Sequence, residues 1–465
     1  MIAKSLAIDV LNAGLATGAD FAEIYLEENN SSYLLLENGK TESALNSTTF
    51  GAGIRLLNKL QSVYGYTNDL SRKGLLKLAT SLANSFKGER LITVEKINKV
   101  RVKNIHVYER PLSEVSREEK IGLLKEAHAV ISAYDKRIVR IQNVFLNNRK
   151  EVTIYNSDGK RFDDFKERGR MVFIAIASEN GKIETSHDGP GASAGMEFFT
   201  GHIDVRDTAQ KVAELAIRML TAAECPSGKM PVVIGNGFGG VVFHEACGHS
   251  LEATSVAKKI SVFSDSLGKQ IAAPIVTAID DGTIPNAWGS NNIDDEGNKT
   301  QRNVLIKDGV CTSFLVDSFN ARRMGAKANG VCRRESYRYE PTSRMSNTYI
   351  ENGKSTPEEI IAATKLGLYA ASMGGGSVNP ATGEFNFAVS EAYIIRDGKI
   401  AEPVRGATLI GSGAEVLKKI DMIGNDLKRS QGMCGSVSGS IPTDVGQPTI
   451  RISEILVGGR GGALK

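Results

Sequence analysis

The segment from Gly235 to His249 constrains the fold of this chain most strongly. Two of only six histidines, His244 and His249, bracket Glu245 and Gly248 in a glycine-rich, otherwise apolar run. On an ideal α-helix, residues five positions apart point about 140° apart, so a straight helix cannot aim both imidazoles at one point. We predict either a one-residue bulge between Glu245 and His249 or a helix that ends at Gly248, because glycine tolerates both.

These residue types also indicate a chemistry. Imidazole is a common zinc ligand, and a carboxylate beside the first histidine can accept a proton from an attacking water, which makes Glu245 the candidate catalytic base. Two helix-surface histidines with a chance glutamate are the alternative, which the scarcity of histidine disfavours. A catalytic zinc needs a third protein ligand. Cys247, Cys434, remote histidines and carboxylates are candidates; we favour Cys434 because flanking glycines let its loop bend, whereas Cys247 is equally explained as a small buried hydrophobe.

The glycines of the same segment imitate a nucleotide-binding motif. Gly235-x-Gly237-x-x-Gly240 follows a predicted strand, and Asp265 falls roughly where a ribose-binding acid would stand. A parallel series of strands and helices is not apparent around it. We therefore predict that these glycines form a tight turn and let a helix pack closely on a strand.

The length of 465 residues predicts more than one domain. We expect an α+β fold, with an N-terminal helix/strand domain at 1–224, possibly split near 110–135, and a larger β-rich domain at 225–465 that carries the metal-binding helix. Pro226 and Gly228 mark the boundary. Apolar spacing predicts helices at 3–17, 74–86, 114–134 and 208–220, and short strands at 22–26, 32–36, 49–56, 62–66, 140–146, 151–155, 170–178 and 231–234.

In the second half, the clearest helix is predicted at 357–373, because Pro357 is followed by two glutamates. Gly374–Gly376 would then be its C-cap or a point of close approach to a substrate.

Charge and cysteine usage exclude several classes of protein. A net charge of +4 without a long basic block does not indicate a nucleic-acid partner. Asp9 interrupts the first apolar stretch before a signal sequence develops, and no apolar run approaches the length of a membrane span. Five dispersed cysteines favour a reducing cytoplasm over a disulfide framework.

His244-Glu-Ala-Cys-Gly-His249 resembles the H-E-x-x-x-H motif of the TldD/TldE (PmbA) metallopeptidases. The likeness continues through motifs in the same order along the chain: Gly18–Glu23, Gly51–Arg55, Asp294–Gly297, Arg333–Tyr337, Arg344–Tyr349, Gly374–Pro380, Gly406–Gly411, Met433–Gly435 and Val445–Thr449. In that family the TldD-type subunit carries the metal motif and the TldE-type subunit lacks it, so this chain resembles the TldD type.

The resemblance implies one zinc per chain, held by His244, His249 and Cys434, with Glu245 as base. Iron or cobalt also suits such ligands. It further implies peptide-bond hydrolysis in short or unfolded polypeptides and a dimer with a TldE-type paralogue or with itself. An extended substrate would suit strand addition to the β-rich half. The alternatives are a zinc-stabilised peptide-binding or chaperone-like protein without turnover and, from the glycine turn, a nucleotide-dependent oxidoreductase.

Two charged stretches in these motifs have two interpretations each. Arg333, Arg334, Tyr337 and Arg344 could bind a peptide carboxylate or stabilise an oxyanion, but a solvated or structurally paired stretch is favoured. Asp294–Glu296 resembles a cation-binding run, and a solvated loop is favoured.

Overall fold

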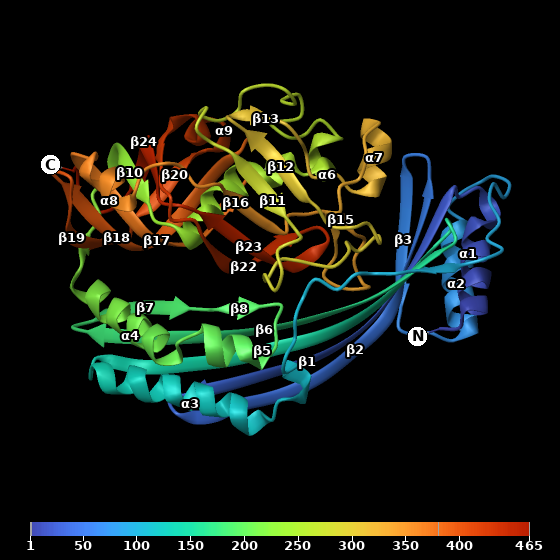
Figure 1. Ribbon diagram of the computed structural model, residues 1–465, viewed down its shortest axis with the longest axis horizontal. Coiled ribbons are helices and arrows are strands. Elements are labelled where there is room, and N and C mark those ends of the chain that lie inside the picture. The colour runs from blue at the N-terminus through green and yellow to red at the C-terminus, as the bar shows by residue number, and fades with distance from the viewer. Residues whose placement is uncertain (1, 380, 465) are drawn as a thin grey trace.

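The computed structural model describes residues 2–379 and 381–464. Met1 and Lys465, the outer ends of the two predicted domains, and Pro380, the last residue of a family-like motif, lie outside the described residues. A long curved sheet from the first half lies beneath two packed sheets from the second half (Figure 1). The predicted α+β class is confirmed, whereas the domain division at residue 225 stays a prediction.

The first sheet has the order β3-β2-β1-β5-β6-β4, with β7 and β8 paired to β6. Its strands are β1 Phe21–Glu37, β2 Lys40–Asn58, β3 Gln61–Thr67, β4 Asn98–Val100, β5 Ile138–Asn156, β6 Lys160–Glu179, β7 Lys182–Asp188 and β8 Gly191–Ala192. Runs predicted as separate strands, 22–26 with 32–36 and 140–146 with 151–155, are halves of single strands. The polar residues between them continue the ladder, as in Asn29 opposite Thr49 and Lys150.

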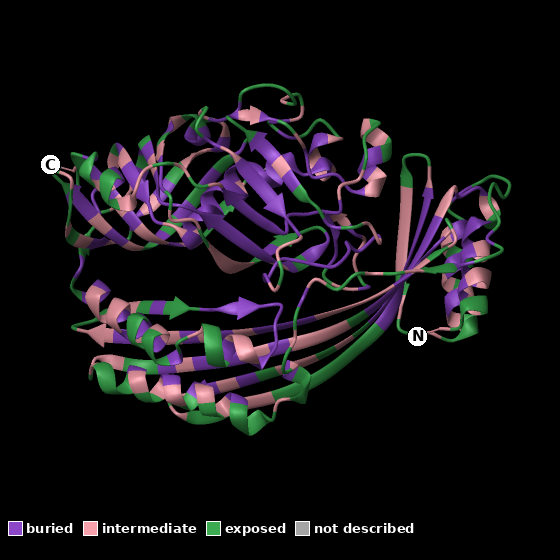
Figure 2. Ribbon diagram, in the orientation of Figure 1, coloured by how far each residue is buried: buried purple, intermediate pink, exposed green. Residues whose placement is uncertain are grey.

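Four helices cover one face of this sheet at its two ends (Figure 1). They are α1 Lys4–Gly14, α2 Arg72–Ala83, α3 Arg117–Tyr134 and α4 Val205–Thr221, so the four helices predicted here are confirmed to within a few residues. Ser71, Ser116 and Asp204 begin α2, α3 and α4, because each side chain accepts a hydrogen bond from a backbone N–H three residues on. Between the helix pairs the sheet is exposed, most clearly along β2 (Figure 2).

The second half forms a sheet of eight strands and a sheet of six strands around one apolar core. The eight-stranded sheet runs β17-β10-β24-β20-β18-β19-β9 with β21 on β24, and the six-stranded sheet runs β13-β12-β11-β16-β23-β22. The bounds are β9 Ala223–Glu224, β10 Gly228–Ile234, β11 Ala278–Asp281, β12 Arg302–Lys307, β13 Val310–Cys311, β16 Asn347–Ile350, β17 Leu366–Val378, β18 Glu384–Arg396, β19 Lys399–Arg405, β20 Thr408–Ser412, β21 Ile420–Ile423, β22 Lys428–Ser436, β23 Gly439–Gln447 and β24 Ile450–Gly458.

Short elements complete this half: α6 Ala253–Val256, α7 Ser318–Met324, α8 Pro357–Ala362, α9 Gly413–Val416 and the pair β14 Cys332–Arg333 with β15 Thr342–Ser343. Within the residues described, no helix combines the length and the apolar character needed to cross a bilayer.

The helix predicted at 357–373 is wrong beyond its first two turns. Thr356 forms a capping box with Glu359, but α8 ends at Ala362 and β17 begins at Leu366. β17 pairs with β10 and β18, and these two ladders outweigh the helical propensity of its alanines and leucines. Gly374–Gly376 therefore lie within a strand and are not a helix C-cap.

The acidic run Asp294–Glu296 is buried, so its interpretation as a solvated loop is wrong. Glu296 accepts a 2.7 Å bond from Arg55 of β2, and Asp295 pairs at 2.7 Å with Lys166 of β6. These bases come from more than 100 residues away, which local composition cannot reveal. The run therefore binds the second half to the first sheet.

Candidate metal centre

The segment with the two histidines follows β10 as a chain of short helical turns. It passes from a 3₁₀ turn, Gly237–Gly240, through α5, Val241–Phe243, into a π-helical turn, His244–Gly248. The backbone N–H of His249 bonds to the carbonyl of His244, five residues back. The predicted one-residue bulge is thus confirmed. Its consequence is that the two imidazole rings lie 5.0 Å apart, edge to face.

Glycine makes the position of this turn possible. A Cβ on Gly240 would stand 2.4 Å from the backbone of Gly446 in β23, and one on Gly413 would stand 1.7 Å from the carbonyl oxygen of Ala246. Gly237 has a left-handed φ of +69°, which closes the turn after β10. The predicted tight turn and close packing are confirmed.

The nucleotide interpretation of these glycines finds no support in the topology. β10 is parallel to β17 but antiparallel to β24, so it does not belong to a parallel strand series. Asp265 is exposed and pairs with Lys259 on the surface.

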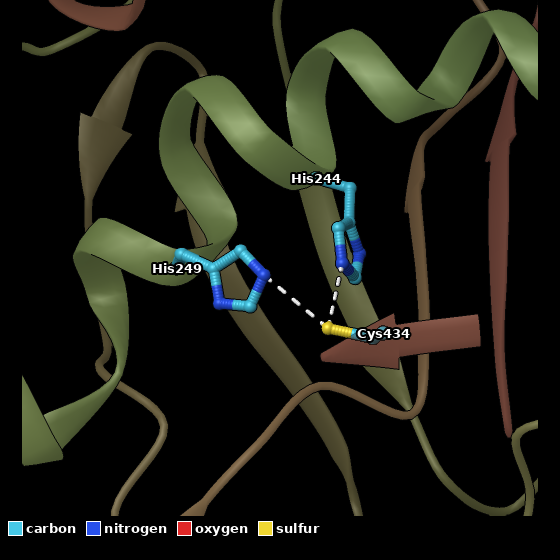
Figure 3. A group of neighbouring side chains, drawn as sticks. All are labelled: His244, His249 and Cys434. Carbon is cyan, nitrogen blue, oxygen red and sulfur yellow. Dashed lines mark hydrogen bonds between the residues drawn. The ribbon is translucent and has the colours of Figure 1, made fainter. Parts of the chain in front are cut away.

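Cys434 of β22 completes a buried cluster with the two histidines (Figure 3). Its Sγ lies 3.2 Å from Nε2 of His244 and 3.2 Å from Nε2 of His249. All three side chains are buried, and their donor atoms lie within 4.8 Å of one another. Residues 190 and 185 positions apart in the sequence therefore meet at one point.

The protonation of this cluster departs from that of isolated side chains. Burial raises the pKa of the Cys434 thiol, but His244 and His249 outweigh it and hold that pKa well below its ordinary value. Burial lowers the pKa of His249, but Glu252 and Cys434 outweigh it and raise that pKa well above its ordinary value. The cluster thus favours a thiolate, which is the form of cysteine that binds metals.

The donor set and its spacing fit a zinc ion. Zn–N and Zn–S bond lengths of roughly 2.05 and 2.3 Å place tetrahedral nitrogen and sulfur ligands about 3.5 Å apart. The two N–S separations here are 3.2 Å. Two imidazoles and one thiolate also leave a fourth position for water or substrate.

Glu245 lies beside the cluster. Its Oε2 is 3.7 Å from Nε2 of His249, and its side chain is partly exposed whereas the three donors are buried. It can therefore exchange a proton with a water or a substrate that reaches the donors.

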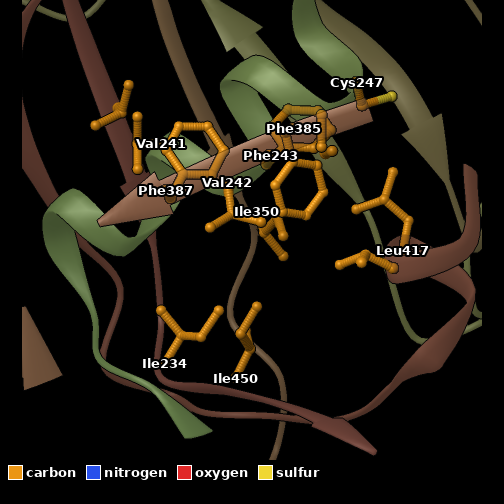
Figure 4. Packing of buried hydrophobic residues seen from close by; sticks show 14 of the residues in the cluster. Ile234, Val241, Val242, Phe243, Cys247, Ile350, Phe385, Phe387, Leu417 and Ile450 are labelled. Atoms are coloured by element: carbon orange, nitrogen blue, oxygen red, sulfur yellow. The ribbon is translucent and has the colours of Figure 1, made fainter. Parts of the chain in front are cut away.

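Cys247 lies elsewhere. It is fully buried and belongs to the same apolar cluster as Phe243, Phe385 and Leu417 (Figure 4), and burial raises the pKa of its thiol well above the ordinary value. Its interpretation as a small buried hydrophobe is confirmed. All five cysteines are free.

The basic stretch is buried and structurally paired, as favoured from the sequence. Arg333 donates to the carbonyls of Met345 and Pro442, and Arg334 pairs at 2.7 Å with Glu23. Tyr337 packs against Gly51 of β2. The side chain of Arg344 is fully buried and holds the chain around Cys434.

Sequence reasoning missed two residues that contact the histidines. Thr348 Oγ1 lies 3.0 Å from Nδ1 of His244, and Glu252 Oε1 lies 3.3 Å from Nδ1 of His249. Glu252 carried a signal, because a residue three positions after His249 lies on the same side of a helical turn. Thr348, on β16, lies within the family-like motif Arg344–Tyr349, but nothing in that motif pointed to a contact with His244.

A buried His/His/Cys cluster beside a carboxylate is the type of centre found in metal-dependent hydrolases. Comparison with known proteins agrees. Sequence profiles of the PmbA/TldA metallopeptidases match at 22–85 (domain 1), 110–220 (central domain) and 227–459 (C-terminal domain). The chain belongs to the TldD/PmbA family of metallopeptidases.

Individual relatives span nearly the whole chain. The Metalloprotease TldD homolog of Haemophilus influenzae is 37% identical, over 95% of this chain and 93% of its own. A metalloprotease of Methanothermobacter thermautotrophicus is 31% identical, over 95% and 96%. The crystal structure of TldE from Thermococcus kodakarensis has the same fold, with a TM-score of 0.77 at 18% identity, over 97% and 99%.

Proposed function

We propose that this chain is a zinc-dependent peptidase in which His244, His249 and Cys434 hold one zinc ion and Glu245 acts as the base. The observation that carries the proposal is the convergence of three buried donor atoms within 4.8 Å, beside a partly exposed carboxylate. Zinc, when bound, polarises a scissile carbonyl and makes water more acidic.

The side chains divide the remaining work. Glu245 takes the proton of the attacking water and returns it to the leaving amine. The imidazoles of His244 and His249 and the thiolate of Cys434 supply the three ligand atoms. Since Cys434 contributes a negative charge, it tempers the acidity that the metal supplies.

We further propose that the substrates are short or unfolded polypeptides bound in extended form. β22, which carries Cys434, is an outer strand of its sheet, so a peptide strand can run alongside the ligand. Such a segment must be free of its own secondary structure, which favours short or unfolded polypeptides as substrates.

The first test is metal content. The chain, purified without added zinc, should contain about one zinc, and Cys434→Ala should lose it. Cys247→Ala is the matched control, because the same atoms are removed from the apolar core, and it should keep the metal. Full zinc in Cys434→Ala would refute the ligand assignment.

The second test separates turnover from binding. Glu245→Gln keeps the shape of the side chain and should retain zinc while hydrolysis of an unstructured fluorogenic peptide falls by roughly 10²–10⁴-fold. A zinc-stabilised peptide-binding protein without turnover would instead show no zinc-dependent cleavage in wild type and unchanged peptide affinity in Glu245→Gln.

We propose that the chain works in the cytoplasm, paired with a TldE-type paralogue or with a second copy. The five free cysteines and the TldE fold of the Thermococcus protein support this proposal. Native mass spectrometry of the chain, alone and with the paralogue, tests the pairing; a chain that stays monomeric in both would contradict it.

A further inference from the structure

One buried guanidinium joins the two parts of the chain that carry His249 and Cys434. Arg344 donates through Nη2 to the carbonyl of Cys434, and through Nη1 to Ser438 Oγ at 2.8 Å and to Gly439 O at 2.9 Å. These bonds fix the turn between β22 and β23. Arg344 thus determines where the sulfur of Cys434 stands relative to the histidine turn.

The same guanidinium reaches towards the histidine turn. Arg344 Nε lies 3.9 Å from Glu252 Oε1, and that oxygen lies 3.3 Å from Nδ1 of His249. Among the described residues, Arg344 Nε makes no hydrogen bond, whereas Glu252 Oε1 faces Nδ1 of His249. The negative charge of Glu252 is therefore held between two positive or proton-bearing groups, the imidazole of His249 and the guanidinium.

The two histidines are held differently. A neutral hydroxyl, from Thr348, stands at Nδ1 of His244, whereas a carboxylate stands at Nδ1 of His249. A carboxylate there favours the tautomer with the proton on Nδ1 and leaves the lone pair of Nε2 directed at the metal position. The imidazole of His249 also becomes a stronger electron donor.

We propose that Glu252 and Arg344 are a pair of positioning residues, which set the orientation of His249 and the place of Cys434 together. This inference rests on the proposed zinc site. Loss of either member would free one ligand and leave the charge of the other member buried without its partner. We expect zinc to bind about 10–100-fold more weakly, the range found when groups that orient metal ligands are removed.

The test uses the full-length chain with Glu252→Gln and Arg344→Lys. Glu23→Gln is the matched control, because Glu23 is also a buried glutamate paired with arginine but contacts none of the three ligands. Zinc affinity is measured by competition with a chelator of known affinity, and cobalt(II) is bound in parallel so that its absorption spectrum reports the ligand geometry.

The expected result is weaker zinc binding and an altered cobalt–thiolate band in both site variants. In Glu23→Gln both quantities should match wild type, even if its melting temperature falls. Wild-type affinity and spectrum in both site variants would overturn the inference while leaving the zinc site intact. If wild type itself bound no zinc, the proposed function would fail first, and the inference with it. Should Arg344→Lys not fold, Glu252→Gln decides alone.

Discussion

Replacing Gly413 with alanine tests whether close backbone packing holds the π-helical turn His244–Gly248 in place. The new Cβ would stand 1.7 Å from the carbonyl oxygen of Ala246, whereas real Cβ atoms essentially never come closer than 3.0 Å. Both groups are backbone, so no side chain can rotate away. Either α9 or the π-helical turn must move by at least 1.3 Å.

The cost of that movement can be bounded. Overpacking in a close-packed interior typically destabilises by about 1–3 kcal/mol, and a backbone clash belongs at the upper end of that range. Ala246 is adjacent to Glu245, and a displacement of about 1 Å at a catalytic group can lower a rate roughly 100-fold. We expect Gly413→Ala to lower the free energy of unfolding by about 3 kcal/mol and to remove most of the proposed zinc-dependent peptidase activity.

Trp288 provides the assay, because it is the only tryptophan and its Nε1 donates at 2.9 Å to the carbonyl of Gly432, two residues before Cys434. Urea unfolding followed by its fluorescence should shift to lower concentration in Gly413→Ala. Gly375→Ala is the control, since a Cβ there meets nothing within 4 Å. An unfolding midpoint and activity equal to those of wild type would refute the argument.

Three further predictions concern other parts of the molecule. Burial raises the pKa of Asp280 to about 6, so the folded state holds this proton more tightly than the unfolded state. The contribution of Asp280 to the free energy of unfolding should therefore fall as pH rises from about 4 to about 6. Asp280→Asn should remove this pH dependence, measured by urea unfolding at several pH values. An unchanged pH dependence in the variant would contradict the raised pKa of Asp280. Arg55→Met leaves two buried glutamates without their shared partner and should lower the free energy of unfolding by about 3–5 kcal/mol. Asp9→Asn, at an exposed ion pair, should lower it by less than about 1 kcal/mol. Equal losses for the two variants in urea unfolding would contradict this prediction. A strong chelator should lower the melting temperature of wild type but not of Cys434→Ala, because only a bound metal adds binding free energy to the folded state; equal shifts would argue against the site.

Much of the site was predictable because its signals are local. The five-residue spacing of His244 and His249 required either a bulge or a helix end at Gly248, and the structure has a π-helical turn there. The preference for Cys434 over Cys247 came from the glycines around it, and the structure brings Cys434 to the histidines and packs Cys247 in the core. The contact of Thr348 with His244 depends on tertiary packing, so it emerged only with the fold, whereas the contact of Glu252 with His249 is local and was overlooked.

The errors in the fold share one physical cause. Residues after Ala362 have helical propensity, yet pairing with β10 and β18 makes them a strand. Asp294–Glu296 look solvated locally, yet Arg55 and Lys166 reach them from the first sheet. Contacts between residues far apart in the chain decided both, and local composition does not contain them.

The separation of the ligands in the sequence sets an order of events during synthesis. A ribosome makes the two histidines first, and Cys434 follows 190 and 185 residues later. In the proposed zinc site, the third ligand is therefore absent until Cys434 has emerged and β22 has paired with β23. Under that proposal, the growing polypeptide, itself unfolded, would meet only an incomplete metal site.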